Sequence, residues 1–491
     1  MAPSSLRRDG RNQACLCEAL EARMAFDATL PHVAYYPEGY SSGSINEFVP
    51  ISNPHEVEVA YELHARYEWG QRDQLIASGV IAPSARGGVT ISDAQRPEDR
   101  VVRGDTPYAL VLRSSLPLAA QFSHYDFGTA IGEAFTSTTS RAWSFGEGRR
   151  DSDLSRDFVL VYNPGDDAVE VELTAYGEDR SMTTVRQRIE GQRRGGWSME
   201  DVPGLSRGLH SIRLVSSGPV VAAQSRYELQ TGRGYGAVGT PEGGATAGVL
   251  PAVSFDDSFY DRNGDDSSSD HARRFPRSAG QASISILNAG ATVANVRLVF
   301  LSESDDGRVE RLVRVDPSSR TTISMREAAL FLGDDQVAAV YTSDVPVTVT
   351  GAVFQGQDAT GVEAGTIAAT QWSFGEGYMS RARAGRGVLE ELYIFNPGRG
   401  ELRVSIDLLL SDGRVLTFTE STDGLEVDDF KLHEELPRLM TREDLWFGVR
   451  VRASRPIVAM MEHWDGGNGG GFSTFGMPSG TVVNLRDVLA I

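Results

Sequence analysis

One block of sequence occurs four times in this chain of 491 residues, and each copy places a large aromatic residue eight positions after a proline. The copies run from Pro117 to Tyr125, Pro219 to Tyr227, Pro346 to Phe354 and Pro456 to Trp464. An asparagine marker precedes each block, and the spacings between Asn53, Asn163, Asn288 and Asn396 are 110, 125 and 108 residues. Such a period is far longer than a solenoid repeat and close to the size of a small domain. The sequence therefore predicts four copies of one domain.

The stretch after each asparagine marker alternates between apolar and polar residues. In the second unit Val169, Val171 and Leu173 alternate with Glu170 and Glu172. This pattern is typical of an antiparallel strand with one face on a core and the other in water. The Asn-Pro-Gly sequence at the marker predicts a tight turn, because proline presets φ and glycine tolerates positive φ. Each unit is expected to be a two-sheet β-sandwich of about seven strands.

The predicted fold class is all-β, a tandem array of four immunoglobulin-like β-sandwich domains. The expected bounds are 1–32 for an N-terminal tail, 33–140 for the first repeat, 141–249 for the second, 250–369 for the third with an acidic insertion, and 370–491 for the fourth. A glycine-rich loop is expected after each aromatic residue, ending at Gly132, Gly239, Gly361 and Gly476. Tandem domains of this kind are expected to form an extended rod.

Charge and cysteine content narrow the choice of partners and of sites. The 47 basic and 67 acidic residues give a net charge of −20, which repels a phosphate backbone or an anionic bilayer, so nucleic acid is not an expected partner. No stretch approaches the roughly 20 apolar residues of a membrane span. Cys15 and Cys17 both lie in the tail, so the four repeats contain neither a disulfide nor a thiolate metal site.

A short motif opens three of the four units. The segments Trp143-Ser-Phe-Gly-Glu147-Gly148 and Trp372-Ser-Phe-Gly-Glu376-Gly377 are identical, and Tyr35-Tyr36-Pro37-Glu38-Gly39 is a weaker version. With the Asn-Pro-Gly turn and the proline block, this opening resembles a repeat of large secreted and surface proteins of bacteria, in which it looks like Trp-Tyr-Phe-Ala-Glu-Gly. The resemblance implies a cell-surface or extracellular location and a structural or adhesive role. It implies other surface proteins or cell-surface glycans as partners.

The tail carries a second resemblance. Residues Glu18 to Ala28 are similar to the N-terminal Leu-Glu-Pro-Arg sorting motif of large bacterial surface proteins, with Ala22 where that motif has proline. The resemblance implies a route of export for a chain in which no standard secretory signal is visible.

An acidic cluster in the third unit is the candidate metal site. Its residues are Asp256, Asp257, Asp261, Asn263 and Asp265. The segment resembles the start of a calcium loop, but Asp266 stands where glycine is required and Ala272 where the bidentate glutamate belongs. The residues predict either a weak calcium site or a solvated acidic loop, and no other cofactor is expected.

The residue patterns contain no sign of catalysis. Glu38, Glu147 and Glu376 lie beside aromatic residues, as glycosidase carboxylates do, but each unit has one and glycoside hydrolysis needs two facing one cleft. They are interpreted as structural glutamates at strand-to-loop junctions. The eight histidines form no His-Glu-x-x-His motif, and there is no Gly-x-Ser-x-Gly elbow. We therefore expect a protein that is not an enzyme and has no catalytic residue.

The four aromatic residues of the repeated block leave two functional hypotheses open. They have the polar neighbours Gln121, Gln224, Arg226, Glu462 and Asp465. The aromatics either close the core of each sandwich or form platforms on which sugar rings stack. The first interpretation favours a structural or adhesive protein, and the second favours a carbohydrate-binding array in which several weak sites gain avidity.

Overall fold

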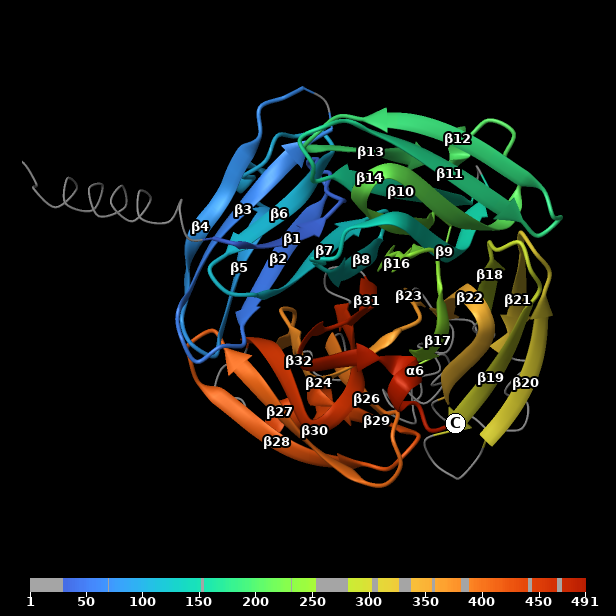
Figure 1. The fold of residues 1–491 in the computed structure, drawn as a ribbon. Coiled ribbons are helices and arrows are strands. Elements are labelled where there is room, and N and C mark those ends of the chain that lie inside the picture. The colour runs from blue at the N-terminus through green and yellow to red at the C-terminus, as the bar shows by residue number, and fades with distance from the viewer. Residues whose placement is uncertain are drawn as a thin grey trace, which may run out of the picture.

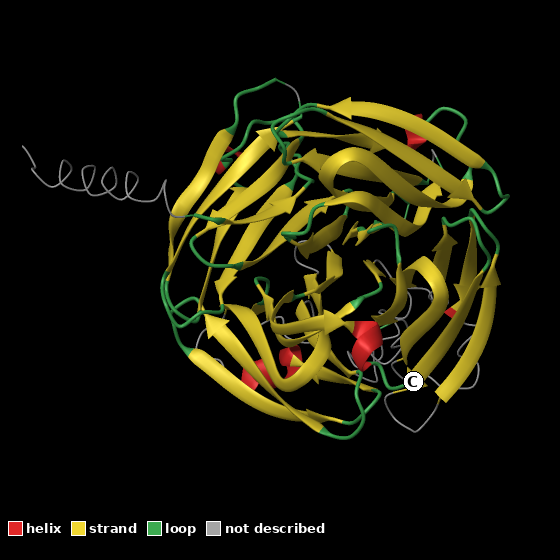
Figure 2. Ribbon diagram, viewed as in Figure 1, coloured by secondary structure: helices red, strands yellow, loops and turns green. Residues whose placement is uncertain are grey.

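The structure of this chain is a computed structural model in which strands dominate and helices are few and short (Figure 2). It describes residues 30–68, 70–151, 154–230, 232–252, 281–302, 308–325, 337–355, 358–380, 388–439, 444–465 and 470–491. The all-β class expected from the sequence is confirmed. No helix in these ranges is long and apolar enough to cross a membrane.

The strands fall into four consecutive sections of chain, here called lobes 1 to 4. Lobe 1 contains β1 (His32–Tyr36), β2 (Asn46–Asn53), β3 (Val59–Tyr67), β4 (Gln74–Ile81), β5 (Ala85–Ser92), β6 (Tyr108–Ser114), β7 (Ala119–Asp126) and β8 (Thr129–Ala134). Lobe 2 contains β9 (Ser140–Arg150), β10 (Ser155–Asn163), β11 (Val169–Gly177), β12 (Met182–Ile189), β13 (Arg193–Ser198), β14 (Gly208–Glu228), β15 (Arg233–Val238) and β16 (Thr240–Pro241).

Lobe 3 contains β17 (Ala245–Leu250), β18 (Gln281–Asn288), β19 (Ala294–Ser302), β20 (Arg308–Val315), β21 (Ser319–Ser324), β22 (Val337–Gln355) and β23 (Asp358–Glu363). Lobe 4 contains β24 (Ile367–Phe374), β25 (Tyr378–Ser380), β26 (Val388–Asn396), β27 (Leu402–Leu410), β28 (Val415–Thr422), β29 (Glu426–Lys431), β30 (Asp444–Asp465), β31 (Gly470–Phe475) and β32 (Met477–Asn484). The short helices are η1 (Pro97–Asp99), η2 (Met199–Asp201), α5 (Leu432–Leu439) and α6 (Leu485–Val488).

Each lobe repeats one order of strand pairing. In lobe 1 the two sheets have the orders β1-β6-β3-β4 and β5-β2-β7-β8. In the other lobes one long strand, β14, β22 or β30, replaces the sixth and seventh strands and passes from the first sheet to the second. Pro219, Pro346 and Pro456 lie where this strand changes sheet, a place that suits a residue without an N–H.

The strand order corrects one expectation. In immunoglobulin domains the first strand shares a sheet with the second, fourth and fifth strands, whereas here it pairs with the sixth. The two-sheet packing itself is observed. In lobe 1, Leu63 and Leu112 of one sheet pack in a common core with Ile51 and Phe122 of the other.

Each asparagine marker is a buried connection between two ends of a sheet. In lobe 2 the side-chain amide of Asn163 donates hydrogen bonds to the carbonyls of Asp167 (2.8 Å), Ile189 (3.2 Å) and Glu190 (3.2 Å), and its oxygen accepts one from the Gly165 N–H (3.0 Å). Asn53 and Asn288 make the corresponding four bonds, and Asn396 makes three of them. A buried amide is retained because its donors and acceptor are satisfied.

The four lobes form a closed ring, so the expected extended rod is wrong (Figure 1). Strands β8, β15, β23 and β31 meet at the centre, and each contacts the corresponding strands of the two neighbouring lobes. Lobe 4 closes the ring against lobe 1, where the Ser52 hydroxyl donates to the Phe374 carbonyl (2.8 Å) and Arg450 donates to the Pro54 carbonyl (2.7 Å). The contact between two neighbouring lobes is called a seam below.

The central strands occupy the segments where glycine-rich loops were expected. Glycine is required at two of these places because a ring from a neighbouring lobe packs directly on the backbone. A Cβ on Gly132 would lie 2.5 Å from the ring of Phe472, and one on Gly361 would lie 2.4 Å from the ring of Tyr235. Gly132 and Gly361 therefore mark inter-lobe packing at the centre of the ring, whereas Gly239 and Gly476 pack against Phe145 and Phe374 of their own lobes.

Candidate functional site

The three opening glutamates are buried and each contacts a neighbouring lobe. Glu38, Glu147 and Glu376 are 7%, 2% and 7% exposed, and they lie at three different seams. A serine hydroxyl of the adjoining lobe donates to each carboxylate, from Ser225 to Glu38, from Ser285 to Glu147 (2.8 Å) and from Ser123 to Glu376 (2.7 Å). The structure therefore does not bring them together as a pair facing one cleft. Each one joins two lobes.

A second buried carboxylate lies inside each of lobes 1, 2 and 4, six residues before the asparagine marker. These residues are Glu47, Asp157 and Glu390. Each accepts the backbone N–H two residues after the opening glutamate, from Tyr40 (2.9 Å), Arg149 (2.8 Å) and Tyr378 (2.6 Å). The second carboxylate thus fixes the backbone that presents the first one to the next lobe.

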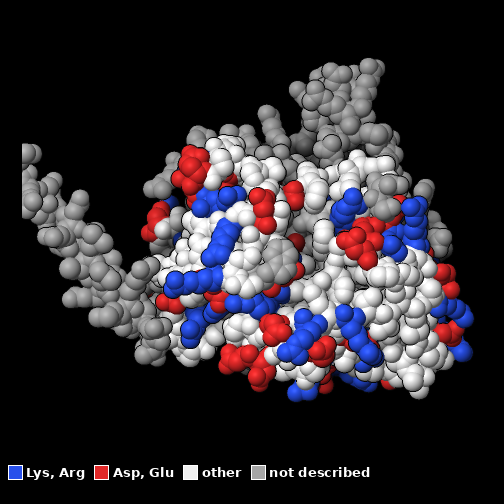
Figure 3. All heavy atoms as spheres, turned by 90° about the horizontal axis from the view of Figure 1, so that it is seen from above, with Lys and Arg blue, Asp and Glu red and all other residues white. Residues whose placement is uncertain are grey.

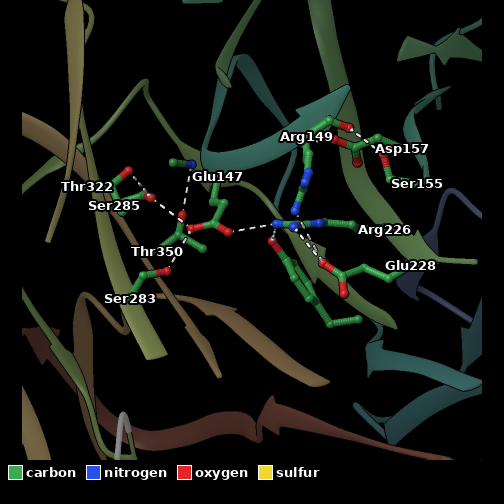
Figure 4. A network of polar contacts seen from close by, with 12 residues as sticks. Glu147, Arg149, Ser155, Asp157, Arg226, Glu228, Ser283, Ser285, Thr322 and Thr350 are labelled. Atoms are coloured by element: carbon green, nitrogen blue, oxygen red, sulfur yellow. Dashed lines mark hydrogen bonds and ion pairs between the residues drawn. The ribbon is translucent and has the colours of Figure 1, made fainter. Parts of the chain in front are cut away.

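The seam between lobes 2 and 3 shows the hydrogen bonds that these groups make (Figure 4). Arg226 is buried and donates to Glu147 (2.7 Å) and to Glu228 (3.2 Å). From lobe 3, Ser283 and Ser285 donate to the other oxygen of Glu147. Breaking a buried ion pair of this kind by removing one partner typically costs about 3–5 kcal/mol. This seam is built to hold two lobes together.

Two further carboxylates lie on the central strands. Burial raises the pKa of Glu133 to about 7, although hydrogen bonds from Thr474 and from two backbone N–H groups lower it in part. Burial likewise raises the pKa of Glu363 to about 8, against the opposing hydrogen bonds from Thr350 and from the Gly146 N–H of lobe 2. Both side chains therefore connect neighbouring lobes near the centre of the ring.

A pocket of about 480 Å³ lies at the seam between lobes 4 and 1. Aromatic and charged side chains line it together, among them Phe48, Arg86, Tyr125, Glu376, Trp446 and Asp465. At its edge the ring of Trp446, which is 44% exposed, lies 5.3 Å from the ring of Tyr378. Pockets that combine an aromatic lining with a few polar groups are the usual form of small-ligand sites. This pocket is the candidate functional site.

One wall of the pocket carries a buried ion pair. Burial by itself lowers the pKa of His463, but the nearby carboxylate of Glu390, whose oxygen lies 2.8 Å from Nδ1, raises it to about 9. The other ring nitrogen of His463 lies 3.3 Å from the hydroxyl of Tyr125, which belongs to lobe 1. Through its contact with Tyr125, His463 contributes to closing the ring.

The structure places the residues singled out in the sequence in different surroundings. Tyr125, Tyr227 and Phe354 are buried and Trp464 is partly buried, so the four aromatics do not form four exposed sugar platforms. Among their polar neighbours, Gln224 and Arg226 belong to the buried carboxylate contacts of lobe 2. Tyr125 and Asp465 line the pocket.

The candidate calcium ligands Asp256, Asp257, Asp261, Asn263 and Asp265 lie outside the described residues, as do the tail and its sorting motif. Within the described part of the chain, no three His, Cys, Asp or Glu residues are grouped in a way that fits a metal ion. Sequence reasoning missed Arg86, Tyr378 and Trp446. The sequence contains a signal that could have identified Arg86, because an arginine recurs at the same place in the fifth strand of lobes 2 and 3.

The outer surface mixes charges of both signs. On the face seen in Figure 3, basic and acidic side chains are interspersed. Cross-strand pairs account for part of this pattern, such as Arg186 with Glu172 (2.6 Å) and Arg297 with Glu310 (2.7 Å). Exposed pairs of this kind contribute little to stability, because water and salt screen the attraction.

Comparison with known proteins gives one family. No curated protein matches the sequence. Among solved structures, Thermotoga maritima 1070 is 21% identical, with 21% of this chain and 95% of that chain covered and a TM-score of 0.20. The Anabaena sensory rhodopsin transducer is 20% identical, with 22% and 95% covered and a TM-score of 0.17. A tetra-tandem repeat from the extending region of a large adhesion protein is 11% identical, with 92% and 98% covered and a TM-score of 0.11.

Similarities this weak carry no argument about fold or activity. The match to a family model is more extensive, since residues 145–422, more than half of the chain, fit the model of a family of unknown function, DUF5719. The chain therefore belongs to the DUF5719 family.

Proposed function

We propose that this protein is a non-enzymatic structural or adhesive module of the bacterial cell surface, built from four β-sandwich domains at 33–140, 141–249, 250–369 and 370–491. The observation that supports this most is the use of the opening glutamates. All three are buried and hydrogen-bonded across seams, so the carboxylates that resemble catalytic ones are committed to holding the lobes together. A rigid ring of this kind suits a protein that presents a surface to partners.

Surface labelling of intact producing cells tests the location. Antibodies against the exposed strands β12 and β20 are expected to label whole cells, and protease added outside is expected to remove the protein. Recovery of the intact protein only after lysis would contradict the proposal. Beads coated with the purified chain, added to the same cells, test the adhesive role, and uncoated beads are the control.

A second candidate function is carbohydrate binding, and the pocket between lobes 4 and 1 favours it. It is lined by the neighbouring rings of Trp446 and Tyr378, which offer apolar surface next to polar groups. Binding of the full chain to a glycan array, lost in Trp446→Ala, supports this function. Binding that is unchanged in Trp446→Ala places the glycan elsewhere on the molecule.

A further inference from the structure

The same arginine position recurs in three lobes. Arg86, Arg194 and Arg320 each pair across the sheet with the residue just before the asparagine marker. The three arginines therefore stand at equivalent places, each on the fifth strand of its lobe and at the seam with the preceding lobe of the ring. Their surroundings can be compared directly.

Two of these arginines are fully engaged by the preceding lobe. Arg194 donates from Nε to the Pro37 carbonyl (3.0 Å) and from Nη1 to Glu68. Arg320 donates from Nε to Ser211 (3.0 Å) and from Nη1 to Glu178 (2.9 Å). At both seams the guanidinium thus meets a glutamate that directly follows the third strand of the neighbouring lobe.

The third arginine has lost these acceptors. Ser411 follows β27 where the glutamates follow β3 and β11, and Gly448 of β30 stands at the place of Ser211. Among the described residues none accepts a hydrogen bond from Arg86, and its Nε is buried without a partner. The side chain as a whole is partly buried, and leaving its charged group without a hydrogen-bond acceptor from the chain is costly. The pocket of about 480 Å³ adjoins Arg86.

We propose that this pocket binds an acidic saccharide, a sugar whose carboxylate pairs with the guanidinium of Arg86. This deepens the second candidate function and rests on it. The planar fork of arginine matches a carboxylate in two parallel hydrogen bonds. At the other two seams a glutamate of the chain accepts a hydrogen bond from the arginine. Here the carboxylate of the ligand takes the place of that glutamate.

The rest of the lining selects a sugar over a bare anion. The charged lining has both signs, since Arg96 and His463 line the pocket together with Glu376 and Asp465. The two carboxylates accept hydrogen bonds from sugar hydroxyls. Trp446 and Tyr378 supply the apolar face against which the ring of a sugar packs. A ligand that fits this lining has one anionic group, several hydroxyl donors and an apolar ring face. A uronic acid has these three properties.

Isothermal titration calorimetry of the full chain tests the proposal, with a linear trimer of galacturonic acid as the probe. The neutral galactose trimer of the same linkage and inorganic phosphate are the comparison ligands. We expect the acidic trimer to bind at least about tenfold more tightly than the neutral one, and phosphate not to displace it at millimolar concentration. Arg86→Gln is expected to weaken binding of the acidic trimer at least about tenfold, the usual scale for one charge-assisted pair.

Arg194→Gln is the matched control, because it makes the same change at an arginine that the chain already satisfies. It is expected to keep the affinity of the unmodified protein and to lower the melting temperature, whereas Arg86→Gln is expected not to lower the melting temperature. No heat with the acidic trimer, equal heat in Arg86→Gln, or full displacement by phosphate would overturn the inference. If neutral glycans on the array bound in a way that depends on Trp446, the second candidate function would still hold although the inference about an acidic sugar had failed.

Discussion

At the scale of single residues, the molecule depends on buried polar side chains that bond to groups far away in the sequence. The asparagine markers show this in its simplest form, since one amide satisfies three carbonyls at the ends of two strands. The sequence indicated a turn at these positions because asparagine, proline and glycine all favour turns. The carbonyls that the amide reaches lie more than twenty residues away in two cases, and no local pattern marks them.

Asn163→Ala is expected to destabilise lobe 2 by about 2–4 kcal/mol, because it leaves buried carbonyls without donors. Differential scanning calorimetry of the full chain measures this as a lower melting temperature. Asn484→Ala is the control, since Asn484 is exposed and no side-chain cap bond is formed there. Equal melting of both variants would show that the marker amide is dispensable.

Glu363 predicts a dependence of stability on pH. Burial raises its pKa from 4.5 to about 8 in the folded protein. Between these values the unfolded chain has released its proton and the folded chain has not, so stability falls as the pH rises and levels off above about 8. Glu363→Gln removes this effect. The variant is expected to gain stability over the unmodified protein between pH 5 and pH 9, by up to about 4–5 kcal/mol at about 1.4 kcal/mol per pH unit.

Denaturant titrations at pH 5, 7 and 9 provide the measurement. Glu426→Gln, on an acidic residue that is not buried, controls for a general effect of charge. A stability difference between the two proteins that stays constant over this range contradicts a raised pKa at Glu363.

At the scale of elements, sequence patterns identified the strands that lie within one lobe and missed those that pack between lobes. The alternation in β11 is a local signal, because one face meets its own core and the other meets water. The central strand β23 has no such alternation. Its glycine, Gly361, is explained only by its packing against Tyr235 of another lobe. The pocket was missed for the same reason, since Arg86 and Trp446 come from different lobes.

Gly361→Ala tests the packing of the central strands. The added Cβ would lie 2.4 Å from the ring of Tyr235, so the two strands must separate, and we expect a loss of about 1–3 kcal/mol. Gly43→Ala is the control, because a Cβ at Gly43 meets nothing within 4 Å. Thermal melting that is unaffected by Gly361→Ala would show that the centre of the ring is loosely packed.

At the scale of the whole molecule, the closed ring distinguishes this chain from a string of domains. The repeat indicated four units from sequence alone, but the way they are arranged depends on contacts between residues that are hundreds of positions apart, such as Ser52 with Phe374. The rod was expected because consecutive domains in a chain need only touch their neighbours in sequence. The ring adds a fourth seam, between the first and last lobes.

Small-angle X-ray scattering separates the two shapes. A compact particle of this length has a radius of gyration of about 23 Å by the usual scaling for folded domains. We expect a value near this for residues 30–491, with a bell-shaped pair-distance distribution. A distribution with a long tail and a much larger radius would show an open chain of lobes.

The described residues run from lobe 1 through lobes 2 and 3 to lobe 4, and no described segment connects the two lobes that meet at the seam between lobes 4 and 1. A pulling force applied between lobe 1 and lobe 4 therefore loads this seam directly, while the other three seams are also held by the connecting chain. Contacts at this seam keep the ring closed, and the pocket with Arg86 lies there. We expect the first rupture in a single-molecule pulling experiment to occur there, at a higher force when the pocket is filled. A ligand bound in the pocket would then stabilise the closed ring against mechanical force.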